Sequence, residues 1–112
     1  MSARADYGDP TPIPRRLRRL PRAHVHGVTV PVAADPLARL LGLAGLSREH
    51  AGEGLLLPRC RSIHTAGMRF ALDVLFLDER GELLREERDV GPMRMLSERR
   101  ARAVLELPSG AA

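Results

Sequence analysis

Several common ingredients are scarce in this 112-residue chain, and each scarcity excludes a class of protein. Cysteine occurs once, as Cys60, so no intrachain disulfide can form and nothing indicates an oxidising compartment. No apolar run reaches the roughly 20 residues of a membrane-spanning helix. No apolar stretch follows the N-terminal arginines, as it would in a signal peptide. We therefore expect a cytoplasmic protein without a membrane span.

Aromatic residues and the signatures of common enzymes are also scarce. Aromatics make up 3% of the sequence and tryptophan is absent, so the core must be built mainly from Leu, Val and Ala. The chain contains no P-loop, GxGxxG, GxSxG or HExxH motif. These motifs mark nucleotide-binding proteins, hydrolases and metalloproteases, so none of these classes is indicated.

Lysine is absent, and the positive charge gathers at the N-terminus. Residues 1–22 hold six Arg and two Asp, a net charge of +4, whereas 12 Arg and 12 acids balance in the rest. Four prolines interrupt this segment. We divide the chain into a flexible Arg- and Pro-rich arm at 1–22 and one compact domain at 23–112. The arm is either a solvated terminus or a phosphate-binding attachment to nucleic acid or a membrane surface. Its candidate contacts are Arg15, Arg16, Arg18 and Arg19.

The residue patterns predict one helix and five strands. An edge strand is expected at 25–32, and Asp35 followed by Pro36 is typical of the start of a helix. Segment 59–68 fits either a strand or a bend. Further strands are expected at 54–58, 72–77, 82–88 and 101–107, with a turn at 78–81. This order favours an α+β fold, a small and mostly antiparallel sheet or partly open barrel with one short helix.

Carboxylates inside apolar strands are the leading site candidates. Asp73 lies in the run 72–77, where a charge is either partnered or costly. We expect its partner to be Arg69, His64 or the backbone of the 66–67 bend. It then either ties that bend to the sheet or forms a wall of a ligand cleft. Glu106 repeats the pattern in the last strand, and His64, Asp73 and Glu106 converge if these strands meet at one rim.

Cysteine, histidine and methionine offer weaker alternatives. Cys60, His64 and Asp73 are ligand types that zinc accepts, but no second cysteine supports them, and a buried thiol beside a hydrogen-bonded histidine is the alternative. In a strand, Cys60 and His64 would stand about 13 Å apart, which disfavours a catalytic pair. His24 and His26 are expected to be surface imidazoles. We expect the methionines to fill the core rather than line a site; these are Met68, Met93 and Met95.

Several motifs occur together in a combination that has a known counterpart. They are His-Thr with a following Met at 64–68, Leu-Asp at 72–73, Asp-x-x-Gly at 78–81, Gly-Pro-Met-Arg at 91–94 and Leu-Glu-Leu-x-x-Gly at 105–110. Over about residues 25–112 the chain resembles the bacterial and archaeal family called domain of unknown function 192. The resemblance implies a small, mostly β domain with one helix. It implies no activity, because the family has no established one.

The resemblance also implies where a shared site would lie. Family members carry motif residues at the positions that here are His64, Thr65, Met68, Asp73, Pro92, Glu106 and Gly110. Ala71 stands where the family often has proline, and the sequence stops where relatives usually continue to a Gly-Asp ending. If the segment that relatives have there closes the sheet or the cleft, this chain has an open sheet edge, and an open edge invites pairing with another chain.

Three functional hypotheses follow. The first is a non-enzymatic ligand- or protein-binding module with a polar rim at His64, Asp73 and Glu106. The second is a small enzyme or metal-dependent protein that uses the same residues and Cys60. The third is nucleic-acid attachment through the arginine-rich arm. The sequence specifies no cofactor, partner or oligomeric state.

Overall fold

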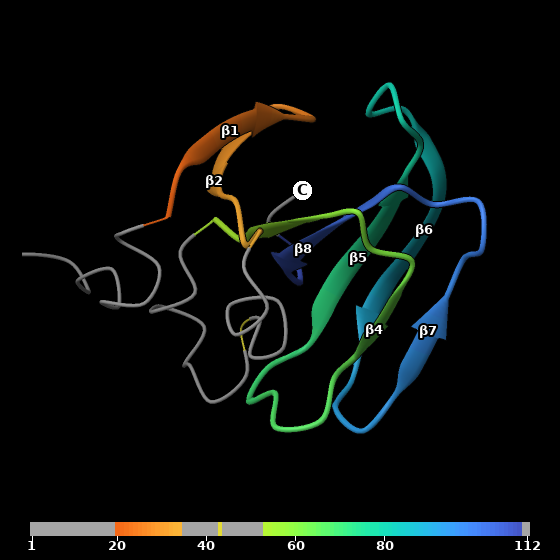
Figure 1. The fold of residues 1–112 in the computed structure, drawn as a ribbon. Helices are drawn as coiled ribbons and strands as arrows, with labels where there is room; N and C mark the ends of the chain where they lie inside the picture. The colour runs from red at the N-terminus through yellow and green to blue at the C-terminus, as the bar shows by residue number, and fades with distance from the viewer. Residues whose placement is uncertain (1–19, 35–42, 44–52, 111–112) are drawn as a thin grey trace, which may run out of the picture.

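The structure, a computed structural model, describes residues 20–34, 43 and 53–110. Within these residues the fold is all-β and contains eight strands (Figure 1). They are β1 (Arg22–Val25), β2 (Val28–Pro31), β3 (Leu55–Pro58), β4 (Ser62–His64), β5 (Leu72–Leu77), β6 (Leu83–Val90), β7 (Met95–Ser97) and β8 (Ala103–Pro108). The α+β prediction is confirmed only in its mostly antiparallel β part, because the predicted helix at Asp35 lies outside the described residues.

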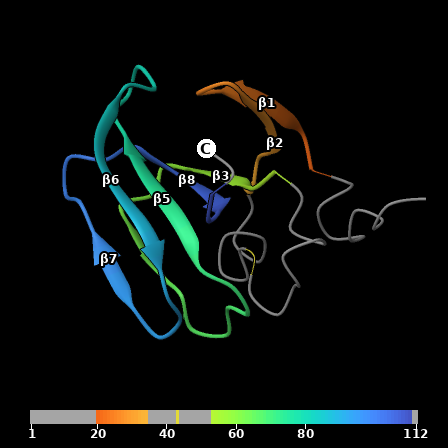
Figure 2. The ribbon, with the colours of Figure 1, turned by 180° about the vertical axis from the view of Figure 1, so that it is seen from behind.

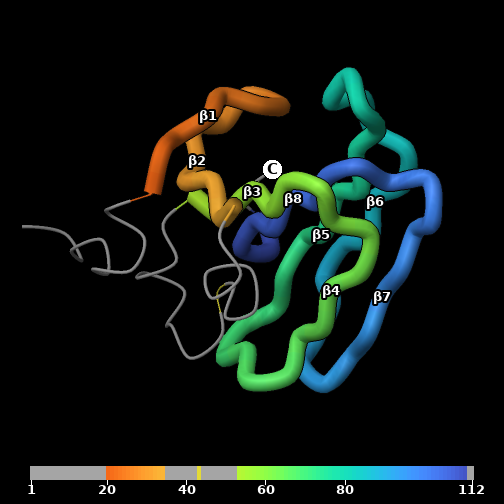
Figure 3. The backbone as a smooth tube through the Cα atoms, viewed as in Figure 1, coloured from red at the N-terminus to blue at the C-terminus, as the bar shows by residue number. Residues whose placement is uncertain are grey.

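A four-stranded antiparallel sheet in the order β3-β8-β5-β6 is the centre of the fold. Two small antiparallel pairs accompany it, β1–β2 and β4–β7. Figures 1 and 2 show the β4–β7 pair on one side of β5 and β6, and the tube in Figure 3 follows the β1–β2 hairpin above β3 and β8. The C-terminal strand β8 therefore lies between β3 and β5.

The central strands are apolar in nearly every position because both faces of the sheet are covered. Along β5, Leu72, Val74 and Phe76 belong to one buried cluster, which also takes in Ile63 and Leu96 of β4–β7. We call it the first core cluster. The alternate residues of β5 and β8 pack with Val30 of the hairpin in a second core cluster; these are Leu75, Leu77, Leu105 and Leu107. Each large side chain buried in this way contributes about 1.5–3 kcal/mol.

Most of the predicted strands are confirmed, and one of them needs correction. The strands expected at 54–58, 72–77, 82–88 and 101–107 correspond to β3, β5, β6 and β8. The single edge strand at 25–32 was wrong: the segment is the hairpin β1–β2. His26 and Gly27 both take positive φ angles, 49° and 82°, which is the backbone of a tight two-residue hairpin turn.

The two remaining strands, β4 and β7, are short. Segment 59–68, left open between strand and bend, contains both: β4 and then a turn in which the Met68 N–H donates to the Thr65 carbonyl. The break expected at 90–93 is present, but the strand β7 that follows it was not predicted. The arm residues Arg15, Arg16, Arg18 and Arg19 lie outside the described residues.

Candidate functional site

The predicted polar rim is not formed, because strand pairing separates its members. In the β5–β8 ladder, Asp73 is opposite Leu107, whereas Glu106 is opposite Val74. Since directly paired residues share a face and neighbours along a strand alternate, the two carboxylates lie on opposite faces of the sheet. His64 is exposed on β4, whose neighbouring residue Ile63 is the one that faces the core. These side chains therefore do not line one site.

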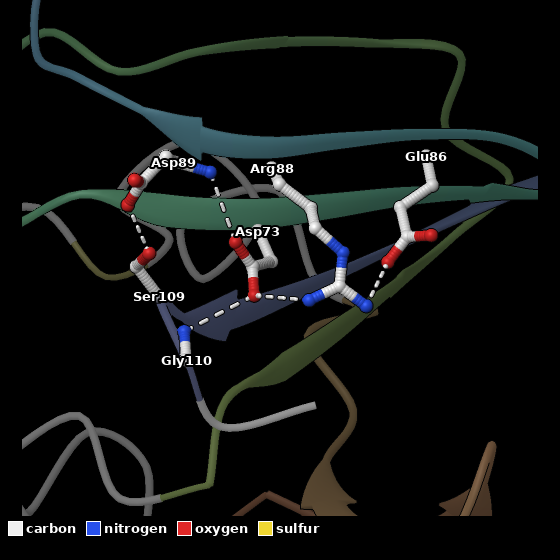
Figure 4. Close-up of polar contacts among 6 residues, drawn as sticks. All are labelled: Asp73, Glu86, Arg88, Asp89, Ser109 and Gly110. Atoms are coloured by element: carbon white, nitrogen blue, oxygen red, sulfur yellow. Dashed lines mark hydrogen bonds and ion pairs between the residues drawn. The ribbon is translucent and has the colours of Figure 1, made fainter.

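Asp73 is the centre of a network of backbone hydrogen bonds at the end of the sheet (Figure 4). Its Oδ1 accepts from the Asp89 N–H at 2.9 Å, and its Oδ2 accepts from the Gly110 N–H at 3.2 Å. Arg88 approaches Oδ2 at 3.9 Å and also pairs with Glu86 at 2.9 Å. The Ser109 hydroxyl donates to Asp89 Oδ1.

A β-bulge explains why this carboxylate is needed. Leu72 pairs with Val90 and Val74 with Glu87, so Asp73 faces two residues of β6 where a regular ladder would offer one. The bulge puts Asp89 in the left-handed region, with φ at 57°, and its N–H points to the Asp73 carboxylate instead of a strand carbonyl. The partners of Asp73 are therefore the bulge and the C-terminal turn, and not Arg69, His64 or the 66–67 bend as predicted.

Glu106 has the opposite environment. It is 4% exposed, and its Oε1 is buried without a hydrogen-bond partner in the part of the chain that the structure describes. Its cross-strand neighbours on the same face are Leu55 and Val74, both fully buried. Burial among apolar groups disfavours the charged form and raises the pKa of Glu106 to about 7.

Thr65 is fully buried and fixes the backbone of the loop between β6 and β7. Its hydroxyl donates to the Gly91 carbonyl and accepts from the Arg94 N–H, both at 2.8 Å. Its own N–H donates to the Arg94 carbonyl at 2.8 Å, and its carbonyl accepts from the Met93 N–H at 3.4 Å. Met93 is held in this arrangement with φ at 65°, a conformation that is uncommon for a residue other than glycine.

One exposed side chain of this loop, Met93, lies next to the exposed side chains of the β4–β7 pair in sequence. We call the set of His64, Met93 and Met95 the methionine–histidine patch. Met93 is 79% exposed and Met95 is 72% exposed, and His64 is the direct cross-strand partner of Met95. The residues between them in the ladder, Ile63 and Leu96, point to the first core cluster. The prediction of core packing is confirmed for Met68, which is 8% exposed, and is wrong for the other two methionines.

The remaining candidates have structural contacts. The Cys60 thiol is buried and donates to the Ser62 carbonyl at 3.2 Å. No group of three or more His, Cys, Asp or Glu side chains within the described ranges is placed to hold a metal ion. At the surface, His24 hydrogen-bonds to the Thr29 hydroxyl and His26 to the Gly81 carbonyl. The described residues also include no helix with the length and apolarity to cross a membrane.

Comparison with known proteins agrees with this fold and adds no activity. The family model DUF192, described as Uncharacterized ACR, COG1430, matches residues 19–112, a span that begins earlier than the expected residue 25. No curated protein matches. A Sinorhizobium meliloti 1021 structure, provisionally described as a transcription regulator, is similar with a TM-score of 0.62 and 24% identity, over 80% of this chain and 79% of that one. A Novosphingobium aromaticivorans protein of unknown function gives a TM-score of 0.59 and 16% identity, over 89% of both chains.

Proposed function

Because this chain belongs to the uncharacterised DUF192 family, we propose its function from the site alone: it is a non-enzymatic binding module that recognises its ligand through the methionine–histidine patch. The single observation that carries the proposal is the exposure of two methionines, 79% and 72%, on the outer side of an ordered β pair. The proposal places the protein in the cytoplasm, where a lone thiol such as Cys60 stays reduced.

Among the buried polar residues that the structure describes, Thr65 and Asp73 support binding over catalysis. The hydroxyl of Thr65 and both oxygens of Asp73 are engaged with backbone groups of two loops. Groups held in this way set the shape of the backbone. Their role in the proposal is to hold the surface on which other side chains are displayed.

The chemistry of the patch supports the same reading. Methionine is unbranched and polarizable, and surfaces rich in methionine adapt to different partners. Two exposed methionines leave apolar surface in contact with water, which is unfavourable. A bound ligand would cover that surface. Met93 additionally keeps a strained backbone, and strain of this kind tends to occur where a protein positions a functional group.

The test is an NMR titration of the full chain that follows backbone amides and methionine methyl groups. The probes are Cu(I), Zn²⁺, an amphipathic leucine-rich helical peptide, ATP and a short DNA duplex. Shifts confined to residues 64–65 and 91–96 with at least one probe support the proposal. Shifts that avoid the patch with every probe contradict it. The matched control is Leu83→Ser, which alters an apolar side chain that is 45% exposed elsewhere on the surface.

Glu106 favours a second candidate function, general acid–base catalysis. A carboxyl group whose pKa lies near 7 can give and take a proton at neutral pH, and burial shifts of this kind are frequent in active sites. On this alternative, any turnover found with a substrate panel would follow the Glu106 pKa and disappear in Glu106→Gln. Turnover that survives this substitution would exclude Glu106 as the acid or base.

A third candidate is nucleic-acid attachment through the arm, favoured by the net +4 of residues 1–22 and by the provisional description of the Sinorhizobium structure. Binding of this kind is independent of sequence and weakens steeply with salt. Fluorescence anisotropy with labelled DNA would compare the full chain with a variant in which Arg15, Arg16, Arg18 and Arg19 are replaced by Gln. Equal DNA affinity of the two proteins would show that these four arginines do not bind DNA.

A further inference from the structure

We propose that the methionine–histidine patch is a binding site for Cu(I), with the thioether sulfurs of Met93 and Met95 and the imidazole of His64 as ligands. The inference rests on the proposed function, because it names the class of ligand that the same surface binds. Two of its three ligands are methionines, and the third is a histidine.

The ligand types select the metal. Thioether sulfur is a soft ligand that suits Cu(I), and imidazole binds copper well. Calcium and magnesium need several oxygen ligands, and the patch itself contains no carboxylate. Zinc in proteins is held by thiolate, imidazole and carboxylate groups, of which the patch supplies one. A soft monovalent cation is therefore the metal that best fits these three side chains.

Strand pairing brings two of the ligands together. His64 and Met95 are direct partners in the β4–β7 ladder, and directly opposed residues have Cβ atoms about 4.5–5.5 Å apart on the same face. That face is the exposed one, because Ile63 and Leu96 occupy the inner face. An imidazole and a flexible thioether that start from such positions can reach a common ion between them.

The third ligand is supplied by the loop that Thr65 fixes. Met93 precedes Met95 by two residues, and its N–H bonds to the carbonyl of Thr65, the residue next to His64. The Thr65 hydroxyl holds the carbonyl before this segment and the N–H after Met93, which keeps the loop against β4. Met93 is held at φ 65°, which is uncommon for a residue other than glycine, and such conformations tend to occur where a protein positions a functional group.

The buried thiol of Cys60 is a competing soft ligand. It is 7% exposed, packs in the first core cluster and donates to the Ser62 carbonyl. Reaching it would require opening the core, whereas both methionines are open to solvent. If the patch binds Cu(I), substitution of the methionines weakens binding. If the thiol binds it, substitution of Cys60 does so.

The experiment is an anaerobic titration of the full chain with Cu(I), in competition with bicinchoninate, followed by NMR of the methionine methyl groups. We expect one Cu(I) per chain, with methyl shifts at Met93 and Met95 and none at Met68. Met93→Leu and Met95→Leu keep the apolar character and each remove one sulfur. Each should weaken binding by at least about tenfold, and the double variant by more, since even outer-shell partners of a metal carry effects of that size. Cys60→Ser and Met68→Leu should leave the affinity unchanged.

Two results would overturn the metal site: no Cu(I) binding by the full chain, or binding that persists in the double variant and is lost in Cys60→Ser. The leucine-rich peptide separates this failure from a failure of the proposed function. Peptide shifts at the patch without Cu(I) binding would refute the metal and retain the binding surface. An absence of shifts at the patch with both probes would refute the metal site and the proposed surface together.

Discussion

Asp73 and Glu106 lie on the neighbouring strands β5 and β8 but on opposite faces of the central sheet. Asp73 is paired with Leu107 and accepts two backbone N–H groups, whereas Glu106 is paired with Val74 and leaves Oε1 without a partner among the described residues. Both carboxyl groups are almost completely buried, at 1% and 4% exposed. Their effects on stability should therefore differ in kind.

Glu106 should make the protein less stable as the pH rises from about 4.5 to about 7. Burial raises its pKa from the ordinary 4.5 to about 7, so in this range the unfolded chain releases a proton that the folded chain keeps. The contribution to stability is full below pH 4.5 and is lost as the pH passes through 7. The total loss is on the order of 3 kcal/mol. Urea unfolding at a series of pH values between 4 and 8 measures it.

Glu106→Gln provides the matched comparison, because it keeps the shape and removes the ionisation. The difference in unfolding free energy between the two proteins should favour the Gln variant progressively above pH 4.5 and level off above pH 7. A difference that stays constant across the range would show that Glu106 ionises in the folded protein as it does in the unfolded chain.

Asp73→Asn should destabilise the fold by about 1–3 kcal/mol, because the amide can accept from one of the two backbone N–H groups and presents its own donors to the other. Hydrogen exchange should accelerate at Asp89 and Gly110, because their N–H groups donate to the Asp73 carboxylate. Glu79→Gln removes an exposed acid from the turn at the opposite end of β5 and should change stability by less than about 0.5 kcal/mol. Equal stability of the two variants would contradict the assigned role of Asp73.

The sequence was sufficient to locate the four strands of the central sheet and the two unusual carboxylates. Continuous apolar runs marked β5 and β8, since strands buried on both faces lose the alternation of polar and apolar residues. Asp73 and Glu106 stood out because each interrupts such a run. The sequence could not say which face each occupies, because a register shift of one residue would move every side chain to the other face.

The methionine–histidine patch was beyond sequence reasoning for a different reason. Met68, Met93 and Met95 are chemically identical. The pairing of β4 with β7 sets the exposure of Met95, whereas Met68 and Met93 lie in the turn and the loop next to these strands. β7 has three residues, too few for a reliable alternation pattern. The bulge at Asp89 and the positive φ of Met93 were also hidden, because neither position is glycine.

Thr65→Val should loosen the loop between β6 and β7 and destabilise the protein by about 1–3 kcal/mol. The valine keeps the buried volume but leaves the Gly91 carbonyl and the Arg94 N–H without the hydroxyl that now serves both. Hydrogen exchange at Arg94 reports the loosening directly. Thr65→Ser keeps the hydroxyl and should retain most of the protection. If valine and serine behave alike, the hydroxyl is not what holds the loop.

Gly54→Ala should be the most damaging alanine substitution among Gly27, Gly54, Gly81 and Gly91. An ideal Cβ at Gly54 would lie 2.2 Å from the Glu106 carbonyl oxygen and 2.8 Å from Leu107 Cδ2, and φ is 126°. The first clash is with backbone, so β3 and β8 would have to separate at the end of the sheet. Overpacking and backbone strain together should cost about 3 kcal/mol or more.

Two other glycines separate these causes. Gly91 has nothing within 4 Å and no positive φ, so Gly91→Ala should be close to neutral. Gly27 also has open surroundings but φ at 82°, so Gly27→Ala reports backbone strain alone and should fall between the two. Urea unfolding gives the three values, and hydrogen exchange in β3 shows whether the loss begins there. A Gly54→Ala protein as stable as Gly27→Ala would mean that β3 and β8 can separate at this end without cost, and that the burial of Glu106 does not depend on their close approach.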